Sequence, residues 1–287
     1  MNGISPRDLV FDFLAKVIRI LIIALALLIT VVPFLYLFIN SIKLPMEFLT
    51  VPPTIIPTQI SWANYQDLFF TEGGTTTRFL INSIVITVAT TVISVFVGSL
   101  AAYSLARLEL PFRLSVIIAF LFLVVRFYPK ITTTLPYYVL MRNFHLLDTQ
   151  LAIIIAHVSI TLPFVVWLML TFFQELPKEL EQSAMLDGCS PWQRFSKVVL
   201  PLAAPGLGTA AILTAIVSWN EFLIASSLAS VKAKTLPVAI TSFVTDKGIL
   251  WGPMSAMGTV IVIPILIFGL FAQRYLVRGL TLGAVKE

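Results

Sequence analysis

The chain has 287 residues, of which 58% are hydrophobic and only 11% are charged, with a mean hydropathy of +0.97. Soluble globular chains carry about 25% charged residues, so this composition excludes a soluble domain and indicates an integral membrane protein. The net charge of +5 comes from basic residues that flank apolar runs, so we attribute it to membrane boundaries and expect no nucleic-acid partner.

The first apolar run covers residues 17–39, about the length needed to cross the roughly 30 Å of membrane hydrocarbon. It is too long for the core of a signal peptide, and no small-residue cleavage site follows it, so we expect it to be retained. Residues 43–78 are polar and contain four prolines, which predicts an irregular loop. Because open sheets cannot span lipid, the expected fold class is an all-α membrane protein.

Small and hydroxyl residues recur along the second apolar run, 79–106, a composition that lets membrane helices pack closely. In the third run, 114–128, only twelve residues precede Arg126, so we expect a helix that ends in the interface or lines a water-filled space. Arg126 and Tyr128 either face the cavity or anchor the outer interface, and we favour the anchoring role. Residues 136–146 predict a short helix at the membrane surface.

Three further runs, 151–173, 206–229 and 254–276, complete six expected transmembrane helices. The tripeptide Trp-Asn-Glu at 219–221 falls near the middle of the fifth, and Pro264 is expected to kink or locally break the sixth. The expected organisation is an N-terminal segment, a membrane domain and a C-terminal tail, covering residues 1–16, 17–276 and 277–287.

The one long polar segment between apolar runs, residues 176–205, predicts two short amphipathic helices. Acidic residues stand in the first turn of the first helix, where the helix dipole favours them. Gly188 can adopt the positive φ that ends a helix, and Ser190 with Gln193 forms a capping-box pattern for the next one. Pro201 is expected to stop that second helix. Such a pair beside a membrane suggests a docking element for another protein.

The basic residues favour one orientation by a small margin. With the N-terminus inside, eleven of the 19 lysines and arginines lie on the inner side. This orientation places both termini and the 176–205 segment in the cytoplasm.

Recognisable catalytic motifs are absent from the sequence. No G-x-x-x-x-G-K-[ST] phosphate loop appears, so we expect the chain neither to bind nor to hydrolyse ATP by that route. The two histidines, His145 and His157, are isolated, and Cys189 is the single cysteine, so no metal site is expected. We therefore predict no catalytic residue, no bound cofactor and no enzyme activity for this chain.

The spacing within the polar segment resembles the EAA loop of ABC-importer permeases, whose pattern is E-A-A-x3-G-x9-I-x-L-P. The principal matching positions are Gln182, Ser183, Ala184, Gly188, Leu200 and Pro201. Other segments are similar to the carbohydrate, maltose-type branch of these permeases, and the last one resembles the glycine-rich tail of a maltose-type subunit. These segments are 101–107, 177–181, 186–188, 219–223 and 279–286.

The resemblance implies a maltose-type ABC-importer permease fold with six transmembrane helices and a cytoplasmic coupling helix, in the inner membrane. In that family the first helix of the loop sits in a cleft of an ATPase subunit. Closure of two such ATPase copies, which use ATP and Mg, moves the loop and alternates access to the substrate path. The resemblance assigns this coupling to Glu181, Gln182, Ser183, Ala184, Asp187, Gly188, Leu200 and Pro201.

The resemblance also implies the other partners. A second homologous permease subunit would complete the pathway, and an extracytoplasmic solute-binding protein would deliver the sugar and meet the segment 230–253. Two motif positions differ from the family, because Gln182 stands in place of the glutamate and Ser183 in place of the first alanine. The ionic contact usually assigned to that glutamate is therefore in question here, and Glu181, which points about 100° away on a helix, is the candidate substitute.

Polar residues within the expected spans are candidates for the substrate path, because such groups are costly in lipid and must face a partner or water. These candidates are Trp219, Asn220, Glu221, Asn82 and His157. The alternative for Asn220 and Glu221 is hydrogen bonding to neighbouring helices or to the partner subunit. For His157 the alternative is a satisfied position in the protein interior.

Three functions remain open at the level of sequence. The leading one is a transmembrane permease subunit of an ATP-driven sugar importer. A self-contained secondary transporter driven by an ion gradient is the alternative, although the paired repeats common in that class do not appear here. A membrane scaffold or enzyme subunit would predict no transport.

Overall fold

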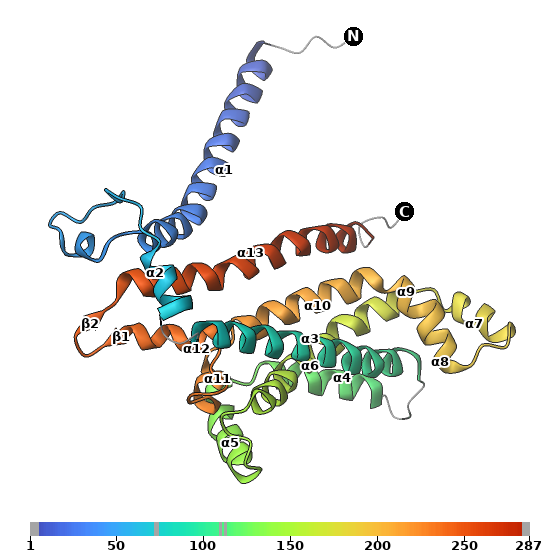
Figure 1. Ribbon diagram of the computed structural model, residues 1–287. Coiled ribbons are helices and arrows are strands. Elements are labelled where there is room, and N and C mark those ends of the chain that lie inside the picture. The colour runs from blue at the N-terminus through green and yellow to red at the C-terminus, as the bar shows by residue number, and fades with distance from the viewer. Residues whose placement is uncertain (1–5, 72–74, 109–110, 112–113, 283–287) are drawn as a thin grey trace. The chain divides into compact units, whose positions relative to one another are not determined.

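The computed structural model describes residues 6–71, 75–108, 111 and 114–282 and is almost wholly helical (Figure 1). Parts of the predicted N-terminal segment, of the turn before residue 114 and of the glycine-rich tail lie outside the described residues. The chain forms two compact units. One comprises residues 1–73 and 242–260, and the other comprises residues 74–241 and 261–287.

The first unit contains one long helix and the polar segment that follows it. Its elements are α1 (Pro6–Ser41), η1 (Pro45–Leu49), α2 (Ala63–Gln66), η2 (Asp67–Thr71), the antiparallel hairpin β1 (Val244–Thr245) and β2 (Gly248–Ile249), and the start of α13 (Trp251–Leu282). The buried Asn64 side chain donates to the carbonyl oxygens of Ser41 at 2.9 Å and Lys43 at 3.2 Å. The expected irregular loop therefore contains short helical turns that are held against the end of α1.

The second unit is built on α3 (Thr75–Arg107), α6 (Gln150–Glu175) and α10 (Ala204–Trp219), which pack against one another, with α4 (Leu114–Arg126) against α6. Most small and hydroxyl residues of α3 that the sequence singles out are buried. At Gly98 a Cβ atom would lie only 2.7 Å from the Val165 side chain on α6, so this position accepts only glycine without a shift. The predicted close packing of the 79–106 run is thus confirmed.

Shorter elements lie at the two ends of these helices. Figure 1 shows α5 (Lys130–Asn143) and α11 (Leu223–Leu228) at one end and α7 (Lys178–Leu186) and α8 (Pro191–Gln193) at the other. The remaining elements are η4 (Arg194–Val199), α9 (Leu200–Leu202), α12 (Leu236–Ala239) and η5 (Ile240–Phe243). The all-α membrane fold expected from the sequence is confirmed.

Four helices in the described part of the chain are long and apolar enough to cross a membrane, or up to six if each bent pair counts as one span. The four helices are Phe11–Ser41, Thr75–Arg107, Gln150–Glu175 and Trp251–Phe271. The bent pairs are Leu114–Arg126 with Lys130–Asn143, at 94°, and Pro191–Leu202 with Ala204–Trp219, at 77°. The third expected span, 114–128, is therefore a short helix followed by a sharp turn.

Three sequence expectations differ from the structure. The expected fifth span, 206–229, is not continuous, because α10 ends at Trp219 and a new helix starts at Leu223. The surface helix begins at Lys130 and not at residue 136, because Pro129 takes the capping position. Pro201 does not stop the second helix of the polar segment, since a proline fits the first turn of α9 and the helical run continues to Leu202.

Candidate functional site

The polar segment forms two helical pieces joined by a tight turn, as its sequence predicts. Gly188 has φ +81°, and the N–H of Cys189 donates to the Ala184 carbonyl at 3.0 Å, which closes the end of α7. The Ser190 hydroxyl accepts from the Gln193 N–H, and the Gln193 side chain accepts from the Ser190 N–H, so the predicted capping box is confirmed. The bend between the two pieces is therefore fixed by local hydrogen bonds.

Glu181 points inward and ties α7 to the end of α3. Its carboxylate accepts a hydrogen bond from the Tyr103 hydroxyl at 2.7 Å and forms an ion pair with the Arg107 guanidinium. Arg107 also donates to the carbonyl of Leu176, just before α7, at 3.2 Å. The side chains of Glu181 and Arg107 are 9% and 11% exposed, so the pair is largely removed from water. Glu181 is thus placed to position the segment against α3.

The second helical piece packs on the same side through aromatic residues. Phe195 and Val199 are buried with residues of α3, α6 and α10. The Phe195 ring lies 4.9 Å from the Tyr103 ring and 6.4 Å from the Phe173 ring, centroid to centroid. Both pieces of the segment are therefore rigidly attached to the ends of the long helices.

The outward face of α7 carries the residues that a partner can reach. Of the eight residues assigned to coupling by resemblance, Gln182, Ser183, Asp187, Gly188 and Pro201 are exposed, Leu200 is half-buried, and Glu181 and Ala184 are buried. Two apolar side chains that the sequence reasoning missed stand at the tip. Met185 is 60% exposed and Leu186 is 88% exposed. Their signal in the sequence is an apolar pair that is separated from the turn glycine by one residue, at positions that cannot share the face of Ala184.

The structure brings His157 and Glu221 together in the interior of the second unit. The Nε2 atom of His157 lies 3.3 Å from the Glu221 carboxylate, and Nδ1 lies 2.9 Å from the Ser218 hydroxyl. The same carboxylate accepts from the N–H groups of Ile224 and Ala225 at the start of α11. Glu221 therefore caps a helix and joins it to α6, which is the reason why α10 and α11 are separate.

Trp219 and Asn220 also lie at this break and not in the middle of a span. The buried Trp219 indole donates to the Ile261 carbonyl at 3.0 Å, and its ring meets Phe268 at 6.5 Å. The exposed Asn220 amide donates back to the Ile216 carbonyl within its own helix. The alternative of hydrogen bonding to a neighbouring helix is therefore met by Glu221, through His157 of α6, and not by Asn220.

Asn82 lies at the end of α3 away from α7 and holds a loop. Its amide donates to the carbonyls of Lys232 and Lys234, both at 2.9 Å, and its oxygen accepts from the Gln150 amide at 2.7 Å. The Asp148 carboxylate accepts from the backbone N–H groups of four successive residues in the same loop, 230–233. Asn82 thus anchors the 230–236 loop.

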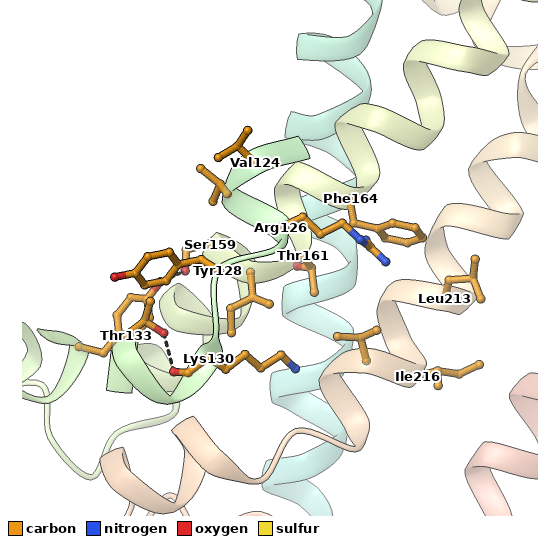
Figure 2. A pocket seen from close by; sticks show the side chains of 14 residues that line it. Val124, Arg126, Tyr128, Lys130, Thr133, Ser159, Thr161, Phe164, Leu213 and Ile216 are labelled. Carbon is orange, nitrogen blue, oxygen red and sulfur yellow. Dashed lines mark hydrogen bonds between the residues drawn. The ribbon is translucent and has the colours of Figure 1, made fainter. Parts of the chain in front are cut away.

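A cavity of about 680 Å³ opens where α4 ends (Figure 2). Its walls come from the ends of α4 and α5, from 159–164 of α6 and from 213–217 of α10. Arg126, Tyr128 and Lys130 line it, whereas none of the five residues expected in the substrate path does. Of the two alternatives for Arg126 and Tyr128, the structure favours the one in which they face a cavity over the favoured one in which they anchor the interface.

Comparison with known proteins gives one family. The family described as "Binding-protein-dependent transport system inner membrane component" matches residues 94–282. The trehalose transport system permease protein SugB of Mycobacterium tuberculosis is 40% identical over 273 residues, covering 94% of this chain and 96% of that protein. The trehalose/maltose transport system permease protein MalG of Thermococcus litoralis is 33% identical, covering 93% of this chain and 97% of that protein.

Solved structures share the fold. A chain of a bacterial ABC transporter involved in the import of the acidic polysaccharide alginate has a TM-score of 0.79 at 22% identity, covering 96% of this chain and 99% of that chain. A bacterial alginate ABC transporter in complex with an alginate pentasaccharide-bound periplasmic protein has a TM-score of 0.68 at 15% identity, with 93% and 94% covered.

Proposed function

The chain belongs to the family of inner membrane components of binding-protein-dependent transport systems, and from this premise we propose that it couples to its ATPase through the segment 178–202. It is a multi-pass, non-catalytic permease subunit of an ABC importer, with ATP hydrolysis on a separate subunit. The observation that supports the coupling assignment is the geometry of α7. Its inner face is pinned to α3 through Glu181, while Met185 and Leu186 stand exposed at its tip.

This arrangement suits transmission of motion from a soluble partner to the membrane helices. An exposed helix with apolar side chains at its tip docks in a groove, in the helix-in-groove mode. Because the inner face is fixed by a largely buried ion pair and by aromatic packing, a displacement of the tip moves α3 with it. Gln182 and Asp187 would add polar contacts at the rim of such a groove.

We further propose the composition of the complete transporter. A second homologous permease subunit supplies the other half of the pathway, and two copies of an ABC ATPase use ATP and Mg on the cytoplasmic side. An extracytoplasmic solute-binding protein delivers the substrate and meets the region 230–253. The names of the relatives, trehalose and maltose permeases, support a sugar as the substrate, and this chain itself is proposed to hold no cofactor, metal or nucleic acid.

Uptake by the reconstituted transporter tests this function against the ion-driven alternative. We expect proteoliposomes that contain the chain, its partner permease and its ATPase to take up labelled trehalose or maltose only with ATP and the binding protein. Omission of either component should reduce uptake to the level of empty liposomes. Uptake driven by an ion gradient alone, without ATP, would show that the chain is a secondary transporter.

The orientation, with both termini in the cytoplasm, has an independent test. Cys189 is the only cysteine, it is free and partly exposed, and it lies at the turn after α7. We expect a membrane-impermeant maleimide to label it in inside-out vesicles and not in intact cells. A Cys189→Ser variant supplies the background, and labelling of intact cells would invert the proposed topology.

A further inference from the structure

The cavity at the end of α4 contains two cationic groups that have no acidic partner in the described part of the chain. Its fourteen lining residues include Arg126 and Lys130 but no aspartate or glutamate. Among the described residues, neither cation forms an ion pair with a carboxylate, because the ion pairs found there are Arg107 with Glu181 and His157 with Glu221. Among the described residues, the charges of Arg126 and Lys130 are therefore not neutralised by a carboxylate at this site.

Arg126 is held in a defined orientation. Its guanidinium carbon lies 4.4 Å from the centre of the Phe164 ring, and Figure 2 shows the side chain reaching across to that ring. A guanidinium attracted to an aromatic face in this way still has N–H groups that can donate to a ligand. Lys130 extends into the same space from the start of α5 (Figure 2).

The rest of the lining alternates hydroxyl groups with apolar surface. Tyr137 and Ser159 hydrogen bond to each other, and Thr161 donates to the His157 carbonyl at 2.8 Å. Tyr128 adds an aromatic hydroxyl, and the opposite wall is aliphatic, with Leu213, Ile216 and Val217 from α10. Small-molecule sites have this character, a mostly apolar cavity of roughly 300–1,000 Å³ with a few oriented polar groups.

These features define the ligand. It must offer several oxygen acceptors to the two cations, and it must also present C–H surface to aromatic and aliphatic walls. A sugar ring does both, since its rim carries hydroxyl and ring oxygens and its faces are C–H surface. We propose that this cavity is a saccharide subsite on this subunit, in which Arg126 and Lys130 donate hydrogen bonds to sugar oxygens and Phe164 orients Arg126. The assignment rests on the proposed function as a sugar importer.

Direct binding measurements on the complete transporter test the subsite. The transporter, with its partner permease and ATPase, is placed in lipid nanodiscs without the binding protein. Trehalose and maltose are titrated and followed by saturation-transfer NMR. We expect saturable binding of at least one sugar, and we expect Arg126→Gln and Lys130→Gln each to weaken it about tenfold or more, because a charge-assisted hydrogen bond is lost. Arg142→Gln, an exposed arginine of α5 outside the cavity, is the matched control and should bind normally.

The other outcomes overturn the proposal. Absence of saturable binding to the wild-type transporter, or equal affinity in all variants, would show that this cavity is not a saccharide subsite. Native mass spectrometry that finds a phospholipid lost specifically from Arg126→Gln, with no sugar bound, would assign the cavity to lipid. Co-purification with the ATPase shows that each variant is folded. If sugar binding fails these tests but uptake still requires ATP and the binding protein, the subsite is rejected and the proposed function is retained.

Discussion

Replacing Glu181 with alanine is expected to reduce ATP-driven uptake by about tenfold or more while the chain still inserts in the membrane. The change leaves the Arg107 guanidinium, only 11% exposed, without its carboxylate, and leaves the Tyr103 hydroxyl without its acceptor. Breaking one side of a buried ion pair typically costs about 3–5 kcal/mol. The loss weakens the contact that fixes α7 to α3. The tip of α7 would then move without moving the membrane helix.

Two measurements and a matched control separate coupling from simple instability. Binding-protein-stimulated ATPase activity and sugar uptake are measured in the same proteoliposomes, and we expect uptake per ATP to fall. Glu179→Ala is the control, because Glu179 is an exposed carboxylate on the same helix. Combining Glu181→Ala with Arg107→Met should restore thermal stability, since the unpaired charge is gone, but should not restore uptake. Wild-type uptake per ATP in Glu181→Ala would contradict the role assigned to this pair.

The local structure of the coupling segment could be predicted because its determinants are near in sequence. The Gly188 turn and the Ser190–Gln193 capping box depend on residues a few positions apart, and both are confirmed. The inward position of Glu181 could not be predicted in this way. Its partners, Tyr103 and Arg107, lie more than 70 residues earlier, on a helix whose packing against α7 has no local sequence signal. The spacing of the EAA-like motif therefore predicted where the coupling segment lies. It did not predict that the side chain of Glu181, the only buried acidic residue of the segment, points inward.

The interruption between α10 and α11 was missed for a related reason. The 206–229 run is apolar enough to read as one helix, and a glutamate inside it suggested a polar group facing the substrate path. In the structure the Glu221 carboxylate competes for backbone N–H groups, by accepting from Ile224 and Ala225, and is also bound to His157 on α6. Hydropathy averages the polarity of all residues in a run, so it cannot detect a helix cap that one residue inside the run forms.

The cavity at the end of α4 also could not be predicted from the sequence, because its lining residues come from separate helices. From sequence alone Arg126 and Tyr128 could either face a cavity or anchor the interface, and their position at the end of an apolar run favours the anchor. The sharp turn after α4, 94° between α4 and α5, brings Lys130 next to them, and α6 supplies Phe164 from more than 30 positions later. Only this arrangement brings Arg126, Tyr128 and Lys130 together in the wall of one cavity.

Asp148 shows how strongly the loop at the end away from α7 is fixed. Its carboxylate accepts hydrogen bonds from the N–H groups of residues 230–233, at 2.9–3.1 Å, and its own φ is +58°. Burial alone would raise the pKa of this carboxyl, but the four backbone hydrogen bonds, foremost those from Lys232 and Ala233, outweigh burial and hold the pKa well below its ordinary value. We propose that this loop belongs to the surface that receives the binding protein, so its order matters for delivery of the substrate.

Asp148→Asn is therefore expected to loosen the loop about tenfold or more, measured as faster hydrogen exchange of the amides at 230–233, which corresponds to about 1.4 kcal/mol of local opening free energy. Asparagine tolerates the same positive φ, so the variant removes the charge and one acceptor oxygen without adding backbone strain.

A carboxyl whose folded pKa is depressed stabilises the fold above its ordinary pKa and loses that contribution only as the pH falls through the folded value. The difference between wild type and Asp148→Asn should then stay constant from pH 7.5 to about pH 5, after correction for intrinsic exchange. Asp246→Ala, on the separate β1–β2 hairpin turn, is the control and should leave these amides unchanged. Equal exchange in wild type and Asp148→Asn would show that the loop is ordered by Asn82 and Ser83 without the carboxylate.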